Sequence, residues 1–497
     1  MLEVVSFICG AAVMVLEMAG ARVIAPHLGT SIVVWTALIG VILAAMSLGY
    51  WLGGRAGDKN PSARKLGMII AGGALFVLLA AVAHAPVLNA VASARLSLHI
   101  SAIVAAVLLF AAPAVFLGMV SPYIIQVRLL DYDESKTGSV MGRFFALSTI
   151  GSIVGTFLGG YWLISWFGTR VILYAVAAVL ALAAMLVMPR RRKIPGALLL
   201  GLCLGLGGYN LLAANENLAS GIARDTRYNH LRVQDGFRGG DPMRFLITDP
   251  GSVQSGMLLN NPDKLAFDYT EHYALAWHIL PEAKNFLMLG GGGYSVPKYL
   301  LASKPEAIVD VVEIDPGITQ VAKEFFFLKD NPGLHIFHED ARVFLNRNAE
   351  ETPGRYDIIM GDTFSSNYNI PFHLGTVECA QRIKVLLRDN GVFVCNIISA
   401  ITGDQGRILR GIHAAFAEVF PQTHIFPVTY PENGSVQQNV MLVALKTPRP
   451  FPLAWDGTMQ AMLSKEWKHP LPSDVPALRD DYAPVERYAM SASHDRE

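Results

Sequence analysis

The chain is poor in charged residues. Lys, Arg, Asp and Glu make up 16% of its 497 residues, and 40 basic residues balance 40 acidic ones. Because the net charge is zero and no basic patch is interleaved with aromatic residues, we expect no nucleic-acid partner. No basic segment precedes the first apolar run, so we do not expect that run to be a cleavable signal peptide.

Residues that bind metals or form disulfides are also few and scattered. The chain has only four cysteines, and neither they nor the histidines of its second half show the spacing of a metal site. The sequence therefore predicts no metal ion and no prosthetic group. The residues considered are Cys9, Cys203, Cys379, Cys395, His272, His338 and His373.

What the chain has in excess is apolar sequence, which makes up 52% of its residues. The excess lies between Met1 and about Ala214, in runs long enough to cross a bilayer, which takes about 20 residues each. We predict an all-α, multi-span membrane domain over residues 1–214, in the inner (plasma) membrane, with the lipid bilayer as its partner. The expected spans are 3–26, 32–54, 66–88, 99–126, 142–165, 169–188 and 195–213.

Two ionisable residues, Glu17 and Arg22, fall inside the first expected span. Charges within a membrane are costly and usually face a partner or a cavity. They indicate either a polar pathway through the domain or a structural tie between helices.

After residue 214 the composition changes to that of an α/β protein. Residues 215–262 predict a small β-rich piece, and residues 263–497 a Rossmann-like, doubly wound and mostly parallel sheet. Its clearest feature is an apolar strand that ends in four glycines, Gly290, Gly291, Gly292 and Gly293. Glycines at such a turn let the backbone approach a ligand, and the following helix offers free N–H groups.

We expect strands at about 307–312, 356–361 and 391–397, and acidic residues lie at strand ends. Glu313 and Asp315 lie about 20 residues beyond the glycines, the distance typical of an acid that binds a ribose diol. Asp340 and Asp362 are expected at two further strand ends. Because ligands bind beyond the carboxyl ends of parallel strands, these residues predict one nucleoside site.

The charges of the loops and the expected substrate point to opposite sides of the membrane for the second domain. The loops at 55–65, 128–143 and 189–193 hold eleven basic residues, against Arg95 and Arg170 in the others, so the N-terminus should be cytoplasmic. Seven spans would then put the second domain in the periplasm, whereas a nucleoside substrate favours the cytoplasm. The eleven are Arg55, Lys59, Arg64, Lys65, Arg128, Lys136, Arg143, Arg190, Arg191, Arg192 and Lys193.

The order of motifs resembles the spermidine synthase (polyamine aminopropyltransferase) family, in the branch with a multi-span domain fused to the N-terminus. Besides the glycine loop, the matching segments are Gly251-Ser-Val-Gln254, Phe267-Asp-Tyr269-Thr-Glu271 and Thr-Tyr430-Pro431. Residues 26–58 are similar to the membrane domain of that branch. Asp480-Asp481-Tyr482-Ala-Pro484-Val-Glu486 resembles its C-terminal motif, which could fold back towards the site or serve as a cap.

The resemblance implies a role for each residue of the site. Glu313 would hold both ribose hydroxyls, Asp340 would accept a hydrogen bond from the adenine amino group, and Asp362 would help to deprotonate an attacking amine. It implies S-adenosylmethionine or its decarboxylated form as co-substrate, and a homodimer. The remaining expected site residues are Tyr269 as a catalytic residue; Gln254, Gly290, Gly291, Gly292, Gly293, Asp315 and Ala341 around the nucleoside; and Tyr430, Asn367 and His373 near the substrate.

Two family acids are missing from this chain. Gly293 and Tyr294 occupy the region where the family has an aspartate for the aminopropyl ammonium, and Asn367 stands where a second loop acid would help to bind the diamine. Losing one partner of a desolvated charge pair costs about 2–5 kcal/mol. The departures put ordinary putrescine aminopropylation in doubt and leave the nucleoside half of the site intact.

Four functions therefore remain open. The first is aminopropyl transfer to an amine, with release of methylthioadenosine. The second is a lyase that converts intact S-adenosylmethionine into methylthioadenosine and homoserine lactone without an acceptor. A methyltransferase would use the same nucleoside fold, because fold does not decide reaction type. A transporter or nucleoside-sensing membrane protein is the fourth, supported mainly by Glu17 and Arg22.

Overall fold

The computed structural model divides the chain into two units, Met1–Arg227 and Tyr228–Glu497. It describes all residues except 30, 95, 131–136, 190–192, 221–222, 227, 249–251, 364–370, 486 and 489–497, and except the side chains of 165, 195, 210–220 and 252. The loop residues Arg95, Lys136, Arg190, Arg191 and Arg192, and Gly251 and Glu486 of the two motifs, therefore lie outside the described part.

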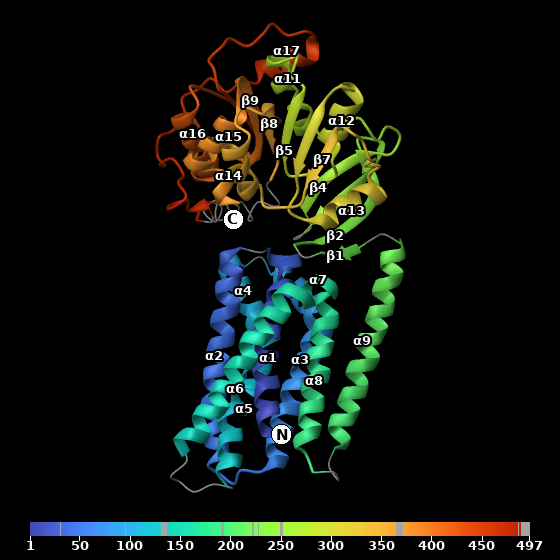
Figure 1. The fold of residues 1–497 in the computed structure, drawn as a ribbon, viewed down its shortest axis with the longest axis vertical. Coiled ribbons are helices and arrows are strands. Elements are labelled where there is room, and N and C mark those ends of the chain that lie inside the picture. Colours follow the sequence, from blue (N-terminus) through green and yellow to red (C-terminus); the bar gives the residue numbers. More distant parts are fainter. Residues whose placement is uncertain are drawn as a thin grey trace. The chain divides into compact units, whose positions relative to one another are not determined.

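The first unit is helical (Figure 1). Among the described residues, six helical segments are long and apolar enough to cross a membrane: Leu2–Leu28, Ile32–Gly57, Ala63–Ser93, Leu98–Leu129, Thr137–Leu163 and Thr169–Val187. This is consistent with a multi-pass membrane protein. The elements are α1 Leu2–Leu28, α2 Ile32–Gly57, α3 Ala63–Ser93, α4 Leu98–Ala106, η1 Val107–Ala111, α5 Ala112–Leu129, α6 Thr137–Phe157, η3 Leu158–Leu163, α7 Ile164–Trp166, α8 Thr169–Val187, α9 Ile194–Ser220 and β1 Ala223–Asp225.

The seventh expected span falls on α9. Its described apolar part, Gly196–Tyr209, is shorter than the other six segments. The fourth and fifth spans are each interrupted by a π-helical turn, Val107–Ala111 and Leu158–Leu163, which the hydropathy pattern did not predict.

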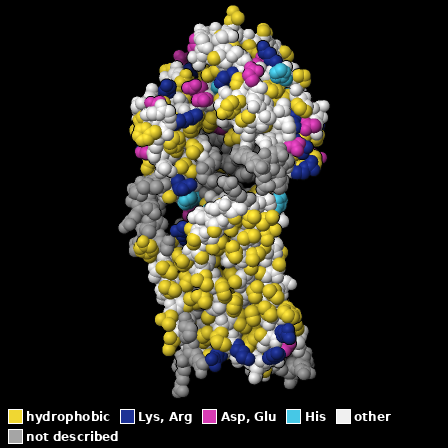
Figure 2. All heavy atoms as spheres, turned by 180° about the vertical axis from the view of Figure 1, so that it is seen from behind, with side chains coloured by type: hydrophobic (Ala, Val, Ile, Leu, Met, Phe, Trp, Pro, Cys, Tyr) yellow, Lys and Arg dark blue, Asp and Glu magenta, His cyan; other side chains and the backbone are white. Residues whose placement is uncertain are grey.

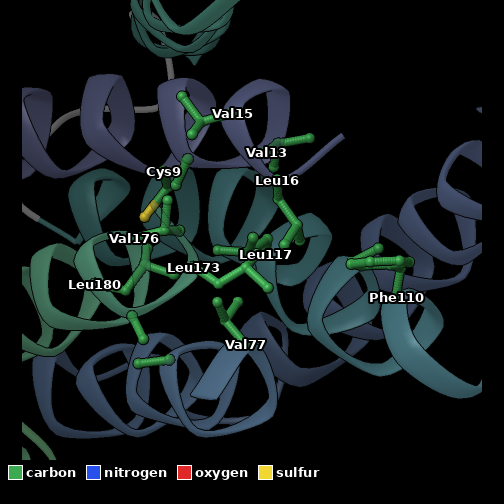
Figure 3. Close-up of a cluster of buried hydrophobic side chains, with 14 of the residues drawn as sticks. Cys9, Val13, Val15, Leu16, Val77, Phe110, Leu117, Leu173, Val176 and Leu180 are labelled. Atoms are coloured by element: carbon green, nitrogen blue, oxygen red, sulfur yellow. The ribbon is translucent and has the colours of Figure 1, made fainter. Parts of the chain in front are cut away.

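Glycines let the helices of this unit approach closely. A Cβ atom at Gly49 or Gly53 of α2 would collide with backbone atoms of α5, and one at Gly151 of α6 would collide with the carbonyl of Phe7 in α1. Small residues at such contacts are the usual basis of helix packing in membranes, where burial from water does not drive association. Large apolar side chains, among them Leu16, fill the interior (Figure 3). The face of this unit seen in Figure 2 is also apolar, and Lys and Arg side chains lie towards its ends.

The second unit begins with an antiparallel sheet of β2 His230–Arg238, β3 Asp241–Thr248 and β4 Ser252–Leu258. A seven-stranded sheet follows, in the order β10-β11-β9-β8-β5-β6-β7, with β5 to β9 parallel to one another and β11 antiparallel to both of its neighbours, β9 and β10. The expected Rossmann-like fold is confirmed. Its strands are β5 Asn285–Leu289, β6 Ile308–Val312, β7 Leu334–Phe337, β8 Tyr356–Gly361, β9 Leu387–Ser399, β10 Gln422–Pro427 and β11 Gln438–Leu445.

Helices cover both faces of this sheet (Figure 1). Since side chains alternate along a strand, Phe286 and Met288 of β5 enter one apolar core and Leu287 and Leu289 enter the other. The buried strands are therefore mostly apolar, and Asp310, fully buried in the middle of β6, is paired with Arg355 and Tyr356. The helical elements are α10 Asp268–Glu271, α11 Ala274–Ile279, α12 Ser295–Ser303, α13 Pro316–Phe325, α14 Ala341–Glu351, η5 Phe372–Leu374, α15 Val377–Leu386, η6 Asp404–Gly406, α16 Arg407–Val419 and α17 Gly457–Ser464.

Candidate active site

A cavity of about 800 Å³ opens at the carboxyl ends of the parallel strands. It is large enough for a nucleoside with a side chain, since small-molecule pockets span about 300–1,000 Å³. Ten of the expected site residues line it: Gln254, Tyr269, Gly290, Gly291, Gly292, Glu313, Asp340, Ala341, Asp362 and His373. The structure thus brings together residues that are more than 100 positions apart in the chain.

The glycine loop lies directly against the segment that carries Asp362. Gly290 has a φ of 93°, which favours glycine, and a Cβ there would collide with the carbonyl of Asp362. The amide of Asp362 in turn donates to the carbonyl of Leu289 at 2.8 Å. The close approach of the two loops therefore requires glycine at position 290.

Glu313 is buried at the end of β6, with 5% of its surface exposed. Its Oε2 accepts hydrogen bonds from the amides of Gly291 (2.8 Å) and Gly292 (3.3 Å), and its Oε1 accepts one from the amide of Asp315 (2.9 Å). Burial raises the pKa of Glu313, and these three amides oppose the shift. The carboxylate therefore holds the glycine loop in place while it faces the cavity.

Asp340 is the N-cap of α14. Its Oδ1 accepts from the amides of Arg342 and Val343, at 2.8 and 3.2 Å. Its Oδ2 lies 3.3 Å from Nε2 of His373, and this contact lowers the pKa of Asp340. Both expected residues thus meet at one wall of the cavity.

Asp362 lies at the end of β8, where Tyr269 and Asn396 contact its carboxylate. Nδ2 of Asn396 donates to Oδ1 at 3.2 Å, and the hydroxyl of Tyr269 is a second partner. Burial raises the pKa of Asp362 to about 6, although both hydrogen bonds oppose the shift. The carboxyl group is therefore mostly ionised near pH 7, and its pKa is close enough to 7 for the group to accept and release a proton.

Three of the described expected residues, Gly293, Asp315 and Tyr430, do not line the cavity. The amide of Gly293 donates to Oγ of Ser255 at 2.8 Å, and Asp315 is the buried N-cap of α13. Tyr430 is 52% exposed, and its amide is held by the side chain of Gln438. Asn367 lies outside the described residues.

Tyr294, beside the position of the missing family acid, faces the protein core. It is fully buried, and its hydroxyl lies 2.6 Å from Oγ1 of Thr319. The side chain of Tyr294 therefore does not replace the missing carboxylate in the cavity.

The sequence analysis missed several polar side chains of the cavity, among them Asn396, Asn439 and Arg238. Asn396 is a polar residue inside an otherwise apolar run of β9, a signal that could have revealed it. Asn439 donates to Oδ1 of Asn396 at 2.9 Å from the antiparallel strand β11, and only the strand pairing places it there. Arg238 stacks on Phe267, with its guanidinium carbon 4.7 Å from the ring centre. Within the described residues, no group of three or more His, Cys, Asp and Glu side chains could hold a metal ion.

The fold and the cavity define a class of protein with a Rossmann-like α/β domain and a pocket at the carboxyl ends of its strands. Residues 267–449 match the spermine/spermidine synthase domain family. The expected resemblance is thus confirmed for residues 267–449.

Individual relatives cover only parts of the chain. A polyamine aminopropyltransferase from Vibrio vulnificus is 32% identical over 184 residues, which are 37% of this chain and 58% of that protein. A mouse eEF1A lysine and N-terminal methyltransferase is 28% identical over 144 residues, 28% of this chain and 20% of the other. A probable spermidine synthase from Corynebacterium glutamicum superposes with a TM-score of 0.44 and 20% identity, over 53% of this chain and 97% of that structure.

Proposed function

We propose that this protein is a membrane-embedded, spermidine synthase-like transferase. It binds decarboxylated S-adenosylmethionine or S-adenosylmethionine and transfers the aminopropyl group of the decarboxylated donor to an amine, releasing methylthioadenosine. The observation that carries the proposal is Asp362, a carboxylate with a raised pKa that faces a nucleoside-sized cavity beside the glycine loop. The domain match and the aminopropyltransferase relative support the same reaction.

The nucleoside half of the cavity offers a partner for each part of an adenosine. The Glu313 carboxylate suits the two ribose hydroxyls, because it has two acceptor oxygens at a suitable separation. Asp340 and His373 form the wall that would meet the base, and the glycine loop, which has no side chains, allows the ligand to approach the protein backbone closely.

The chemical step needs a neutral amine. The amine nitrogen attacks the methylene carbon next to the sulfonium, a C–N bond forms, the C–S bond breaks, and its electron pair returns to sulfur. Asp362 takes the proton that the ammonium group loses. Tyr269 and Asn396 hold the carboxylate in position, and the rest of the rate enhancement comes from orienting the two reactants.

The test uses full-length protein in detergent, incubated with the decarboxylated donor or with intact S-adenosylmethionine, each with and without putrescine. Mass spectrometry identifies the products, and Asp362→Asn is the matched variant. We expect methylthioadenosine and an aminopropylated amine only with decarboxylated donor plus amine, and a large loss in the variant. Binding of the nucleoside without turnover of either donor would refute the transferase.

We infer a second candidate, a lyase acting on intact S-adenosylmethionine, from the charges around the cavity. Among the described residues that line it, Arg238 carries the permanent positive charge, and the family acid for the aminopropyl ammonium is replaced by Gly293. Arg238 and Asp268, whose charged groups are 3.9 Å apart, would suit the carboxylate and ammonium of a methionine tail. A decarboxylated tail has no partner for Arg238.

The lyase step differs from transfer in its need for a base. The carboxylate oxygen of the donor attacks its own chain next to sulfur, an O–C bond forms and the C–S bond breaks, without loss of a proton. Lyase activity should therefore persist in Asp362→Asn and be lost in Arg238→Ala, the reverse of the pattern for aminopropyl transfer. Detection of S-adenosylhomocysteine in the same assay would instead identify methyl transfer.

A further inference from the structure

The C-terminal segment Leu478–Tyr482 folds back onto the domain next to the nucleoside cavity. Arg479 and Tyr482 exchange two backbone hydrogen bonds, at 3.2 and 3.0 Å, which turn the chain sharply at Asp480 and Asp481. The amide of Val377 donates to the carbonyl of Leu478 at 2.9 Å, and the amide of Asp480 donates to Oε2 of Glu378 at 3.0 Å. The turn is therefore attached to the start of α15.

The side chain of Asp480 forms a two-pronged ion pair with Arg342. The guanidinium group donates to Oδ1 and Oδ2 at 3.1 and 2.6 Å, and the hydroxyl of Thr376 donates to Oδ1 at 2.7 Å. The Arg342 side chain is 13% exposed, so water solvates its charge only in part and Asp480 compensates it. Such bidentate pairs fix direction as well as distance.

Arg342 also holds the cavity wall. Its Nη1 donates to the backbone carbonyl of His373 at 2.6 Å, and the ring of His373 contacts the carboxylate of Asp340. The backbone of His373 is thus held by Arg342 in the first turn of α14, and its ring is held by Asp340, the N-cap of that helix. A continuous set of contacts runs from Asp480 through Arg342 to His373 and Asp340.

We propose that Asp480 is a positioning residue for nucleoside binding, which orients Arg342 so that Arg342 holds the wall formed by Pro371 to Leu374 against Asp340. Asp480 acts through Arg342 and does not line the cavity. This inference rests on the proposed function for the identity of the ligand, and it is independent of which form of the donor is used.

The test measures binding of methylthioadenosine to full-length protein in detergent by calorimetry, together with the steady-state constants of whichever reaction the protein catalyses. We expect Asp480→Ala to raise the Kd for methylthioadenosine about fivefold to tenfold, as expected for a lost charge-assisted pair. Asp480→Asn, which keeps the shape and one acceptor oxygen, should give a smaller rise and covers the case in which the alanine variant does not fold. The kcat at saturating donor should stay within about twofold, because Asp362 lies outside these contacts.

Arg479→Gln is the matched control. It removes the neighbouring surface pair with Glu418, whose two side chains are about half exposed, and leaves Arg342 untouched. Its Kd should equal that of the wild type. In a double-mutant cycle, the variant with both Arg342→Gln and Asp480→Asn should bind methylthioadenosine no more weakly than Arg342→Gln alone.

Three results would overturn the inference: an unchanged Kd in both Asp480 variants, an equal rise in Arg479→Gln, or a fall in kcat without a change in Kd. Failure of the wild-type protein to bind methylthioadenosine would refute the proposed function itself. The two failures are therefore distinguished within one experiment.

Discussion

Asn396 donates a hydrogen bond from Nδ2 to Oδ1 of Asp362 across 3.2 Å, and this bond sets the direction of the carboxylate in the cavity. The Oδ1 of Asn396 accepts in turn from Asn439 at 2.9 Å, so its amide cannot rotate without losing both partners. Hydrogen-bonded side chains of this kind fix one orientation of a reactive group.

The first prediction concerns the Asn396–Asn439 pair. Asn439→Ala should lower kcat about threefold to tenfold, because Asn396 keeps Asp362 as a partner but loses its own support. Asn396→Ala should have a larger effect of the same sign. Stopped assays at saturating donor give kcat, and methylthioadenosine binding should be unchanged in both variants. A pure loss of nucleoside affinity would contradict the assigned role.

The second prediction concerns the pH dependence of aminopropyl transfer. Because the pKa of Asp362 is raised to about 6, and the ionised form is the base, kcat/KM for the decarboxylated donor should rise as pH increases through 6. Rates between pH 5 and 8 measure this limb. A profile that stays flat down to pH 5 would show that Asp362 is not the base.

The third prediction follows from the same pKa and concerns stability. The folded-state pKa of Asp362, about 6, lies above the ordinary value of 3.8, so the folded protein binds more protons between these values and the free energy of unfolding falls as pH rises through that window. Asp362→Asn removes the free-energy cost of ionising this buried carboxyl group. At pH 7.5 the variant should unfold at an equal or higher temperature than the wild type, and its free energy of unfolding should be higher by an amount on the order of 1 kcal/mol. Thermal unfolding in detergent measures it, and strong destabilisation would mean that the carboxylate is structural.

The fourth prediction separates ribose binding from loop support at Glu313. Glu313→Gln keeps one acceptor oxygen and loses the charge, and it should weaken methylthioadenosine binding by about tenfold or more. Asp315→Asn is the comparison, because Asp315 is buried nearby without lining the cavity. Calorimetry of both variants checks it, and equal losses would assign both residues to support of the loop.

The fifth prediction uses two adjacent glycines of α2. A Cβ at Gly53 would lie 2.6 Å from Cα of Met119, whereas one at Gly54 meets no atom within 4 Å. Gly53→Ala should therefore destabilise the helical unit by about 1–3 kcal/mol, and Gly54→Ala should be neutral or slightly stabilising. Unfolding in mixed detergent compares them. Equal stability would show that α2 and α5 are not in close contact at this position.

Local patterns were enough for much of the fold. The apolar runs predicted the membrane helices because a bilayer demands about 20 apolar residues in a row. The strand ending at the glycines predicted the tight turn that lines the cavity, since glycine adopts the positive φ that Gly290 and Gly292 have. Glu313, Asp340 and Asp362 were predicted as neighbours because all three follow parallel strands of one sheet.

The membrane half also shows where local patterns stop. Hydropathy measures how apolar a segment is. It does not show where π-helical turns form or which helices pack against each other. Close contacts of Gly49 with α5 and of Gly151 with α1 depend on which faces meet, and that is a property of the packed helices.

The sequence by itself determined the two-part organisation, the parallel sheet and the acids at its edge, because each depends on residues close together in the chain. Only the tertiary structure decided which polar groups surround those acids. Asn439 reaches Asn396 through the register of two antiparallel strands, and Asp480 reaches Arg342 across 138 positions of sequence. Such contacts depend on how distant segments pack, since a hydrogen bond forms only where folding brings donor and acceptor within about 3 Å.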